Sequence, residues 1–253
     1  MVCIEWFKDF ARGMQFHTNS SRKIVNTILH DNKWKLWTPS NGKNDPPPDF
    51  YCDKYKLMME VMRVDDHTFK KNGHYRNPTN EAESRIYNEL KSKGIINGVN
   101  GNTVVVSATS KLPTEQDHNY SWYLANFERV IEKHNQKIEL YRKNHPNYKC
   151  IFFIVDESSA YLVARSKNEI PKTIIPGAPF YGKIHYHFVD DKFITCLSKT
   201  KADYIIWFSP YKHINFANPC IPQLPRAFAY EVSKLQNFYR EKYDTDLIFQ
   251  SEA

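Results

Sequence analysis

The stretch that decides the fold runs from Tyr55 to Val64 and reads Tyr-Lys-Leu-Met-Met-Glu-Val-Met-Arg-Val. Apart from Lys56 near its start, its charged residues are one carboxylate, Glu60, and one arginine, Arg63. Such an apolar run is typical of an inner strand that is covered on both faces. A carboxylate inside it is costly to bury, so we expect Glu60 to meet a partner, a metal ion or an exposed end of the strand.

The segments around this strand predict a mixture of helices and strands. Apolar residues recur at helical spacing in some segments, and continuous apolar runs bounded by polar turns occur in others. Helices are expected at 20–29, 79–91, 120–144 and 228–243, and strands at 34–37, 49–53, 55–64, 103–108, 149–156, 183–189 and 204–208. This mixture predicts an α/β protein with a central mixed, mostly buried β-sheet flanked by helices.

Composition limits the classes of protein to consider. With 253 residues, of which 41% are hydrophobic, the chain is long enough to bury its own core as a single domain over residues 1–253. The sequence has no long apolar run, its first residues carry charges throughout, and its five cysteines are widely spaced. These features predict a cytoplasmic protein with reduced thiols and no membrane partner. The formal charge of +7 favours a polyanionic partner.

The chemistry is expected at two carboxylates. Pro48-Asp49 opens one predicted strand and Glu60 lies within the next, so both side chains can meet at one point. Paired carboxylates suit Mg²⁺ or Mn²⁺, which also take phosphate oxygens as ligands. A bound ion would activate water and stabilise the charge that develops on a phosphodiester. The alternative is structural: Asp49 opens a strand after a proline turn, and Glu60 pairs with Arg63, Arg85 or a lysine.

The order of these elements resembles a known family. A helix, a strand, a strand that opens with Pro48-Asp49, a strand with Glu60 and a further helix are similar to the PD-(D/E)XK nuclease superfamily. The resemblance covers about residues 20–110 and implies a restriction-endonuclease-like core. Residues 111–253 would then pack on the same core as a C-terminal α+β extension. The resemblance implies that Asp49 and Glu60 are catalytic ligands of Mg²⁺ or Mn²⁺.

The sequence departs from the family at the motif lysine. That lysine stands two residues after the glutamate, where this chain has Met62. Strand alternation places Met62 on the face of Glu60 and Arg63 on the other, so Arg63 is no simple replacement. Family members can supply the basic group from a neighbouring element. The candidate lysines here are Lys54, Lys56 and Lys91, of which Lys56 is assigned to the catalytic set.

A basic and aromatic segment follows the Glu60 strand. Residues 65–77 contain Lys70, Lys71, Tyr75 and Arg76. Lysine and arginine meet phosphates, and a tyrosine ring can stack on a base. We therefore expect these four residues to bind nucleic acid at the rim of a substrate groove, and the alternative is a solvated loop.

Two further patterns are considered as sites, and for both a structural interpretation is favoured. Ile151 to Glu157 is similar to a nucleotide-binding strand that ends in Asp156, but no phosphate-binding loop of the GxxxxGK[ST] type accompanies it. The segment therefore predicts a core strand, with Asp156 as an accessory carboxylate near the same sheet edge. His185 and His187 share one face of a predicted strand, and we expect that face to be exposed.

Together these patterns predict a Mg²⁺-dependent endo- or exonuclease that acts on DNA rather than RNA, in a mobile-element or defence setting. Self-association into a homodimer is left open. The alternative function is a catalytically inactive module of the same fold that binds nucleic acid or protein, and Met62 in the lysine position is its main support.

Overall fold

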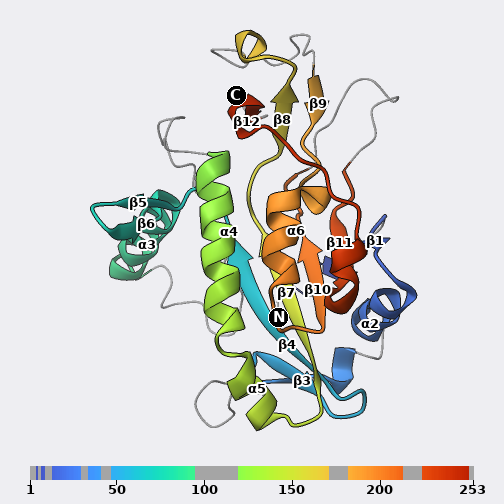
Figure 1. Cartoon of the computed structure of the whole chain (residues 1–253). Helices are drawn as coiled ribbons and strands as arrows, with labels where there is room; N and C mark the ends of the chain where they lie inside the picture. The colour runs from blue at the N-terminus through green and yellow to red at the C-terminus, as the bar shows by residue number, and fades with distance from the viewer. Residues whose placement is uncertain are drawn as a thin grey trace.

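A seven-stranded mixed β-sheet forms the centre of the protein (Figure 1). Its strands follow in the order β1 (Gln15–Phe16), β11 (Ala227–Glu231), β10 (Tyr204–Phe208), β7 (Lys149–Asp156), β4 (Leu57–Val64), β3 (Phe50–Cys52) and β2 (Thr38–Pro39). The central strands β4, β7 and β10 are parallel to one another. Strand β3 is antiparallel to β4, and β11 is antiparallel to β10. The protein therefore belongs to the α/β class that the sequence predicts.

This computed structural model describes most of the chain. The described residues are 13–29, 34–40, 47–94, 119–170, 182–212 and 224–250, with Ile4, Phe7 and Lys8. The predicted strand at 103–108 lies outside them. Among the helices of this described part, none is long and apolar enough to cross a membrane.

Helices cover both faces of the sheet. The helices on one face are α4 (Tyr120–Asn135), α5 (Ile138–Asn144) and α6 (Asp191–Ser198), and α2 (Asn19–Leu29) packs on the other. Beside α4 lie the hairpin of β5 (Phe69–Lys71) and β6 (His74–Arg76) and the helix α3 (Pro78–Ser92) (Figure 1). A second, antiparallel sheet consists of β12 (Ile248–Gln250), β8 (Tyr161–Ala164) and β9 (Gly182–Ile184).

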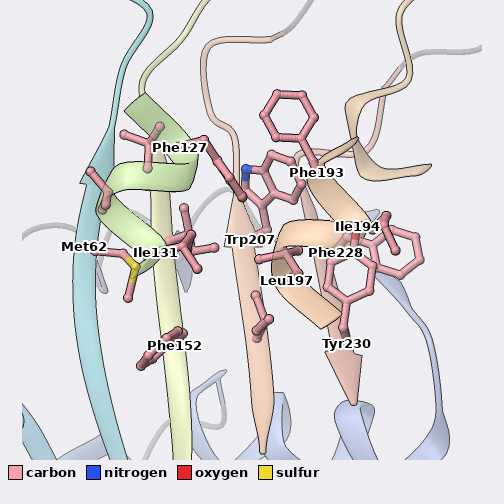
Figure 2. Packing of buried hydrophobic residues seen from close by; sticks show 14 of the residues in the cluster. Met62, Phe127, Ile131, Phe152, Phe193, Ile194, Leu197, Trp207, Phe228 and Tyr230 are labelled. Carbon is pink, nitrogen blue, oxygen red and sulfur yellow. The ribbon is translucent and has the colours of Figure 1, made fainter. Parts of the chain in front are cut away.

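Strand alternation divides the core into two clusters. Met58 and Met62 of β4 point to the face covered by α4 and α6, whereas Leu57 and Met59 point to the face covered by α2. Figure 2 shows Met62 beside residues of α4 on the first of these faces. Seven of the eight β4 residues are buried or half-buried. This confirms the prediction of an inner strand covered on both sides.

The prediction was right for several elements and wrong for others. Helices α2 and α3 and strands β3, β7 and β10 lie where the sequence places them. The predicted helix at 120–144 is broken into α4 and α5. The predicted strand at 34–37 is instead a 3₁₀ helix, Trp34–Leu36.

The predicted helix at 228–243 is wrong for a physical reason. Residues Phe228 and Tyr230 contact one core cluster, and Ala227 and Ala229 contact the other. This alternation buries the segment on both faces of the sheet as β11, and a 3₁₀ helix, Val232–Asn237, follows. Tertiary burial thus overrides the helical spacing of the apolar residues.

The two histidines of the predicted strand at 183–189 are buried rather than exposed. Strand β9 ends at Ile184, and both His185 and His187 are at most 1% exposed. The side chain of His185 pairs with Asp190 at 2.6 Å. Desolvation lowers the pKa of both imidazoles, most strongly that of His187. Both rings pack against aromatic side chains, His185 against Tyr243 and His187 against Trp207.

A buried carboxylate connects the central strands to the helix above them. Asp156, at the end of β7, accepts hydrogen bonds from the Tyr123 hydroxyl of α4 at 2.6 Å and from Trp207 Nε1 of β10 at 2.8 Å. It also accepts the backbone N–H and hydroxyl of Ser158 at 3.1 and 2.5 Å. The ammonium of Lys212, itself 3% exposed, lies 3.7 Å from the same carboxylate. Every oxygen of Asp156 is therefore satisfied.

Replacing Asp156 with alanine is expected to lower the free energy of unfolding by about 3–5 kcal/mol, because Lys212 and several buried donors lose their acceptor. Urea unfolding followed by circular dichroism measures the change. Glu157→Ala is the matched control, since Glu157 pairs with Arg63, whose side chain is 64% exposed, and should cost no more than about 1 kcal/mol. Equal urea midpoints for the two variants would contradict the assignment.

Candidate active site

Asp49 and Glu60 lie opposite each other on the β3–β4 hairpin. The last pair of that ladder is Phe50 with Met59, so Asp49, one residue earlier, stands across from Glu60. The Oδ2 atom of Asp49 accepts the backbone N–H of Val61 at 2.8 Å. The hairpin therefore brings together the two carboxylates that the sequence selects.

The two carboxylates share the face covered by α4 and α5. Tyr51, two residues after Asp49, packs on the same cluster as Met58 and Met62, which flank Glu60 at spacings of two. The predicted face of Met62 is thus confirmed. Arg63 points to the other side, where it pairs with Glu157 at 2.5 Å, as strand alternation requires.

Glu60 is a buried carboxylate whose polar neighbours come from α4 and α5. The residue is 6% exposed. Its Oε1 lies 2.7 Å from Nδ1 of His134, at the end of α4, and the Tyr141 hydroxyl of α5 is the other polar group close to the carboxylate. Because a buried carboxylate next to a second carboxylate is costly, the position of Glu60 beside Asp49 favours a cation at this point.

The environment of Asp49 raises the pKa of its carboxyl group. Burial makes the largest contribution, and the nearby charge of Glu60 adds to it. The hydrogen bond from Val61 and the positive charges of His134 and Lys137 act in the opposite direction. Two carboxylates that repel each other in a partly dry site are the arrangement that a divalent cation relieves.

The break between α4 and α5 brings cationic groups to the carboxylates. α4 ends at Asn135 and α5 begins at Ile138, so Lys137 lies between the two helices. His134, in the last turn of α4, and Lys137 both act on the pKa of Asp49. In a continuous helix over 120–144, Lys137 would lie about one helical turn after His134; the break places it in the connection between the two helices instead.

A phenol also faces this site from α5. The hydroxyl of Tyr141 is buried and lies beside the Glu60 carboxylate. Burial strongly raises the pKa of Tyr141, and a hydrogen bond to Glu60 and the charge of that carboxylate raise it further. The hydroxyl therefore stays protonated and is available as a hydrogen-bond donor beside the carboxylates.

Other residues of the predicted site lie elsewhere. Lys56 is in the turn between β3 and β4, where its ammonium lies 3.5 Å from the Tyr148 hydroxyl. At about 3.3 Å per residue, it is roughly 13 Å along β4 from Glu60. The proposed structural partner of Glu60, Arg63, contacts Glu157 instead.

The basic segment forms the β5–β6 hairpin. Tyr75 is 51% exposed, and Arg76 pairs with Glu81 at 3.2 Å. Lys70 and Lys71 lie on β5, and their side chains are outside the described part of the structure. The hairpin flanks α4, as Figure 1 shows.

Three residues near the carboxylates were not predicted as site residues: His134, Lys137 and Tyr141. The signal for His134 was present, because the residue falls on the apolar stripe of the predicted helix 120–144 and therefore faces the sheet. Lys137 had no such signal, since its position depends on where α4 ends.

The donors at this site fit a magnesium ion only with ligands from outside the protein. In the part of the chain that the structure describes, no group of three or more His, Cys, Asp or Glu residues is placed to hold a metal. Asp49 and Glu60 would supply two oxygen ligands. Mg²⁺ is commonly bound through one or two carboxylates together with waters and substrate phosphates.

No family model, curated protein or solved structure matches the chain. What the fold defines is the class: an α/β protein with a seven-stranded mixed sheet flanked by helices and a small three-stranded antiparallel sheet.

Asp49→Asn is expected to stabilise the protein by about 0.5–1 kcal/mol at pH 7 in EDTA. A raised pKa means that the folded state binds the Asp49 proton more tightly than the unfolded state, so stability is lost as pH rises from about 4 through the raised value. Asparagine keeps an acceptor for Val61 and removes the charge. Thermal unfolding at pH 4 and pH 7 measures the difference, which should be larger at pH 7.

The matched control is Glu139→Gln, because the side chain of Glu139 is 66% exposed and pairs with Lys201 at the surface. This variant should change stability little at either pH. A destabilised Asp49→Asn at pH 7 would show that the Asp49 charge is compensated in the folded protein.

Proposed function

We propose that the protein is a Mg²⁺- or Mn²⁺-dependent phosphodiesterase that cuts DNA. The observation that carries the proposal is the pair of carboxylates, buried Glu60 and partly buried Asp49, that lie opposite each other on adjacent strands. A phosphodiester and a divalent cation would complete this site electrostatically. The finer fold assignment, a restriction-endonuclease-like core with a C-terminal α+β extension, is part of the same proposal, as is a mobile-element or defence setting.

In this proposal the carboxylates are the metal ligands, and residues of α4 and of its junction with α5 support them. Asp49 and Glu60 would hold the ion, which when bound lowers the pKa of water and offsets the charge on the phosphate. Because a carboxylate only accepts, His134 Nδ1 donates to Glu60 Oε1, which fixes the carboxylate and leaves Oε2 for the ion. Lys137 brings positive charge to the site from the α4–α5 junction.

Lys137 is our candidate for the role of the missing motif lysine. Met62 is 3% exposed within the core cluster and has no charge to contribute. Lys137 is exposed, and its charge already lowers the pKa of Asp49. A cation at that point can stabilise the charge that develops on a phosphate during its displacement.

Cleavage assays with supercoiled plasmid, linear duplex and single strands test the function. We expect cutting with Mg²⁺ or Mn²⁺ and none in EDTA. Asp49→Asn and Glu60→Gln should each reduce the rate by at least about 100-fold, because a lost metal ligand removes several kcal/mol of charge stabilisation. Lys56→Met is the matched control and should keep the rate of the unchanged protein, given its contact with Tyr148.

A second candidate function is a non-catalytic module that binds nucleic acid or protein. The buried Met62 in the position of the motif lysine favours it. Salt-dependent DNA binding without cleavage on any substrate, unchanged by Glu60→Gln, would establish this function and overturn the nuclease proposal.

Lys137→Met is expected to slow cleavage roughly 10- to 100-fold and to move the acidic limb of its pH profile upward. The shift follows because Lys137 lowers the pKa of Asp49, so its removal raises that pKa and a higher pH is needed to ionise the carboxylate. Lys137→Arg should return the acidic limb of the pH profile to its position in the unchanged protein, because arginine keeps the positive charge. A slower rate with an unchanged pH profile would assign Lys137 a structural role only.

A further inference from the structure

A second polar site lies beyond the carboxylates along β4 and α4. A pocket of about 280 Å³ opens between the end of β4, the middle of α4 and the β5–β6 hairpin (Figure 1 shows these elements side by side). Its lining includes Arg63, Arg76 and Arg129, with Tyr75, Asn77 and Asn126. At about 3.3 Å per residue, Arg63 is roughly 10 Å along the strand from Glu60. The two side chains leave opposite faces of β4, so this is a distance along the backbone and not between the two sites.

The three arginines can exchange their present contacts for phosphate. Arg63 and Arg76 form ion pairs in which the arginine side chains are 64% and 60% exposed. Exposed pairs of this kind contribute little to stability, and a phosphate offers an arginine a stronger, bidentate partner. Arg129 donates to Asn126 Oδ1 at 2.5 Å, and its Nε is buried with no hydrogen-bond partner.

The carboxylate in the pocket lining does not oppose an anion strongly. Asp65 accepts hydrogen bonds from Asn77 Nδ2 at 2.7 Å and from the hydroxyl of Thr68 at 2.9 Å. The backbone carbonyl of Asp65 accepts a hydrogen bond from Asn126 Nδ2 at 3.0 Å. Asp65 thus holds the loop between β4 and β5 in place, and its hydrogen bonds direct its oxygens toward these amide and hydroxyl donors.

An aromatic ring completes the pocket. The guanidinium carbon of Arg129 lies 4.9 Å from the centroid of Tyr75, which fixes the ring by a cation–π contact. Half of Tyr75 remains exposed. A ring held next to guanidinium groups is the platform on which bases of single-stranded nucleic acid stack while their phosphates are bound.

We propose that this pocket binds a nucleotide of single-stranded DNA, with its phosphate on the arginines and its base on Tyr75. The volume is at the lower limit of ligand pockets and suits one nucleotide. A duplex keeps its bases stacked inside and presents none to the ring, except at a frayed end. Resting on the nuclease proposal, this assigns an unpaired strand as the preferred substrate of the carboxylate site.

Fluorescence anisotropy with a labelled twelve-nucleotide oligo-dT in EDTA tests binding without cleavage. Tyr75→Ala and Arg129→Gln should each weaken binding about 10-fold, whereas Tyr75→Phe should keep it, because the ring can still stack. Tyr239→Ala is the matched control, since Tyr239 is 68% exposed and is absent from the pocket lining. A blunt duplex of the same length should bind more weakly and be insensitive to Tyr75→Ala.

Competition with dTMP and with inorganic phosphate distinguishes a strand from a small ligand. Unlabelled oligo-dT should compete far better than either. Equal competition by dTMP, equal affinity for the duplex, or unchanged binding in Tyr75→Ala would each overturn the proposal. If Tyr75→Ala weakens binding but the unchanged protein cuts no substrate, the pocket assignment stands and the nuclease proposal fails. If cleavage requires Asp49 but binding of the strand is unchanged in Tyr75→Ala, the nuclease proposal stands and the pocket assignment fails.

Discussion

The burial of carboxylates in the sheet is the constraint on which the rest of the structure depends. At the end of β7, Asp156 gathers donors from α4, β10 and the following turn, and Lys212 balances its charge. Because hydrogen bonds and an ion pair together satisfy this group, its burial fixes how α4 lies over the parallel strands. α4 in turn carries His134 to the hairpin. The same helix thus contacts both buried carboxylates, Asp156 through Tyr123 and Glu60 through His134.

These two buried carboxylates differ in their surroundings. Asp156 is fully buried, and protein donors satisfy both of its oxygens. Glu60 is nearly as buried, but its charge lies beside a second carboxylate, and the pKa of Asp49 is raised as a result of its burial and of that charge. This repulsion is the feature from which we propose a bound cation.

Sequence patterns predicted those strands whose residues form a continuous apolar run, because such a run must be buried wherever it lies in the fold. The apolar runs of β4, β7 and β10 and the carboxylates Asp49 and Glu60 needed no knowledge of the rest of the chain. Contacts between distant segments were not accessible in this way. His134 reaches Glu60 from 74 residues away, and β11 is a strand because both faces of the sheet around it are covered. Helix ends also escaped prediction, and the position of Lys137 depends on one.

The hydrogen bond from Val61 to the Asp49 side chain has a consequence for the edge of the sheet. β3 pairs with β4 only as far as Met59, and in the described residues no strand continues that ladder along the rest of β4. A side-chain oxygen therefore takes the place of the next backbone carbonyl. The Asp49 side chain thus occupies the Val61 N–H, the group that the next residue pair of a longer ladder would use, and joins the two strands one step beyond their last backbone pair.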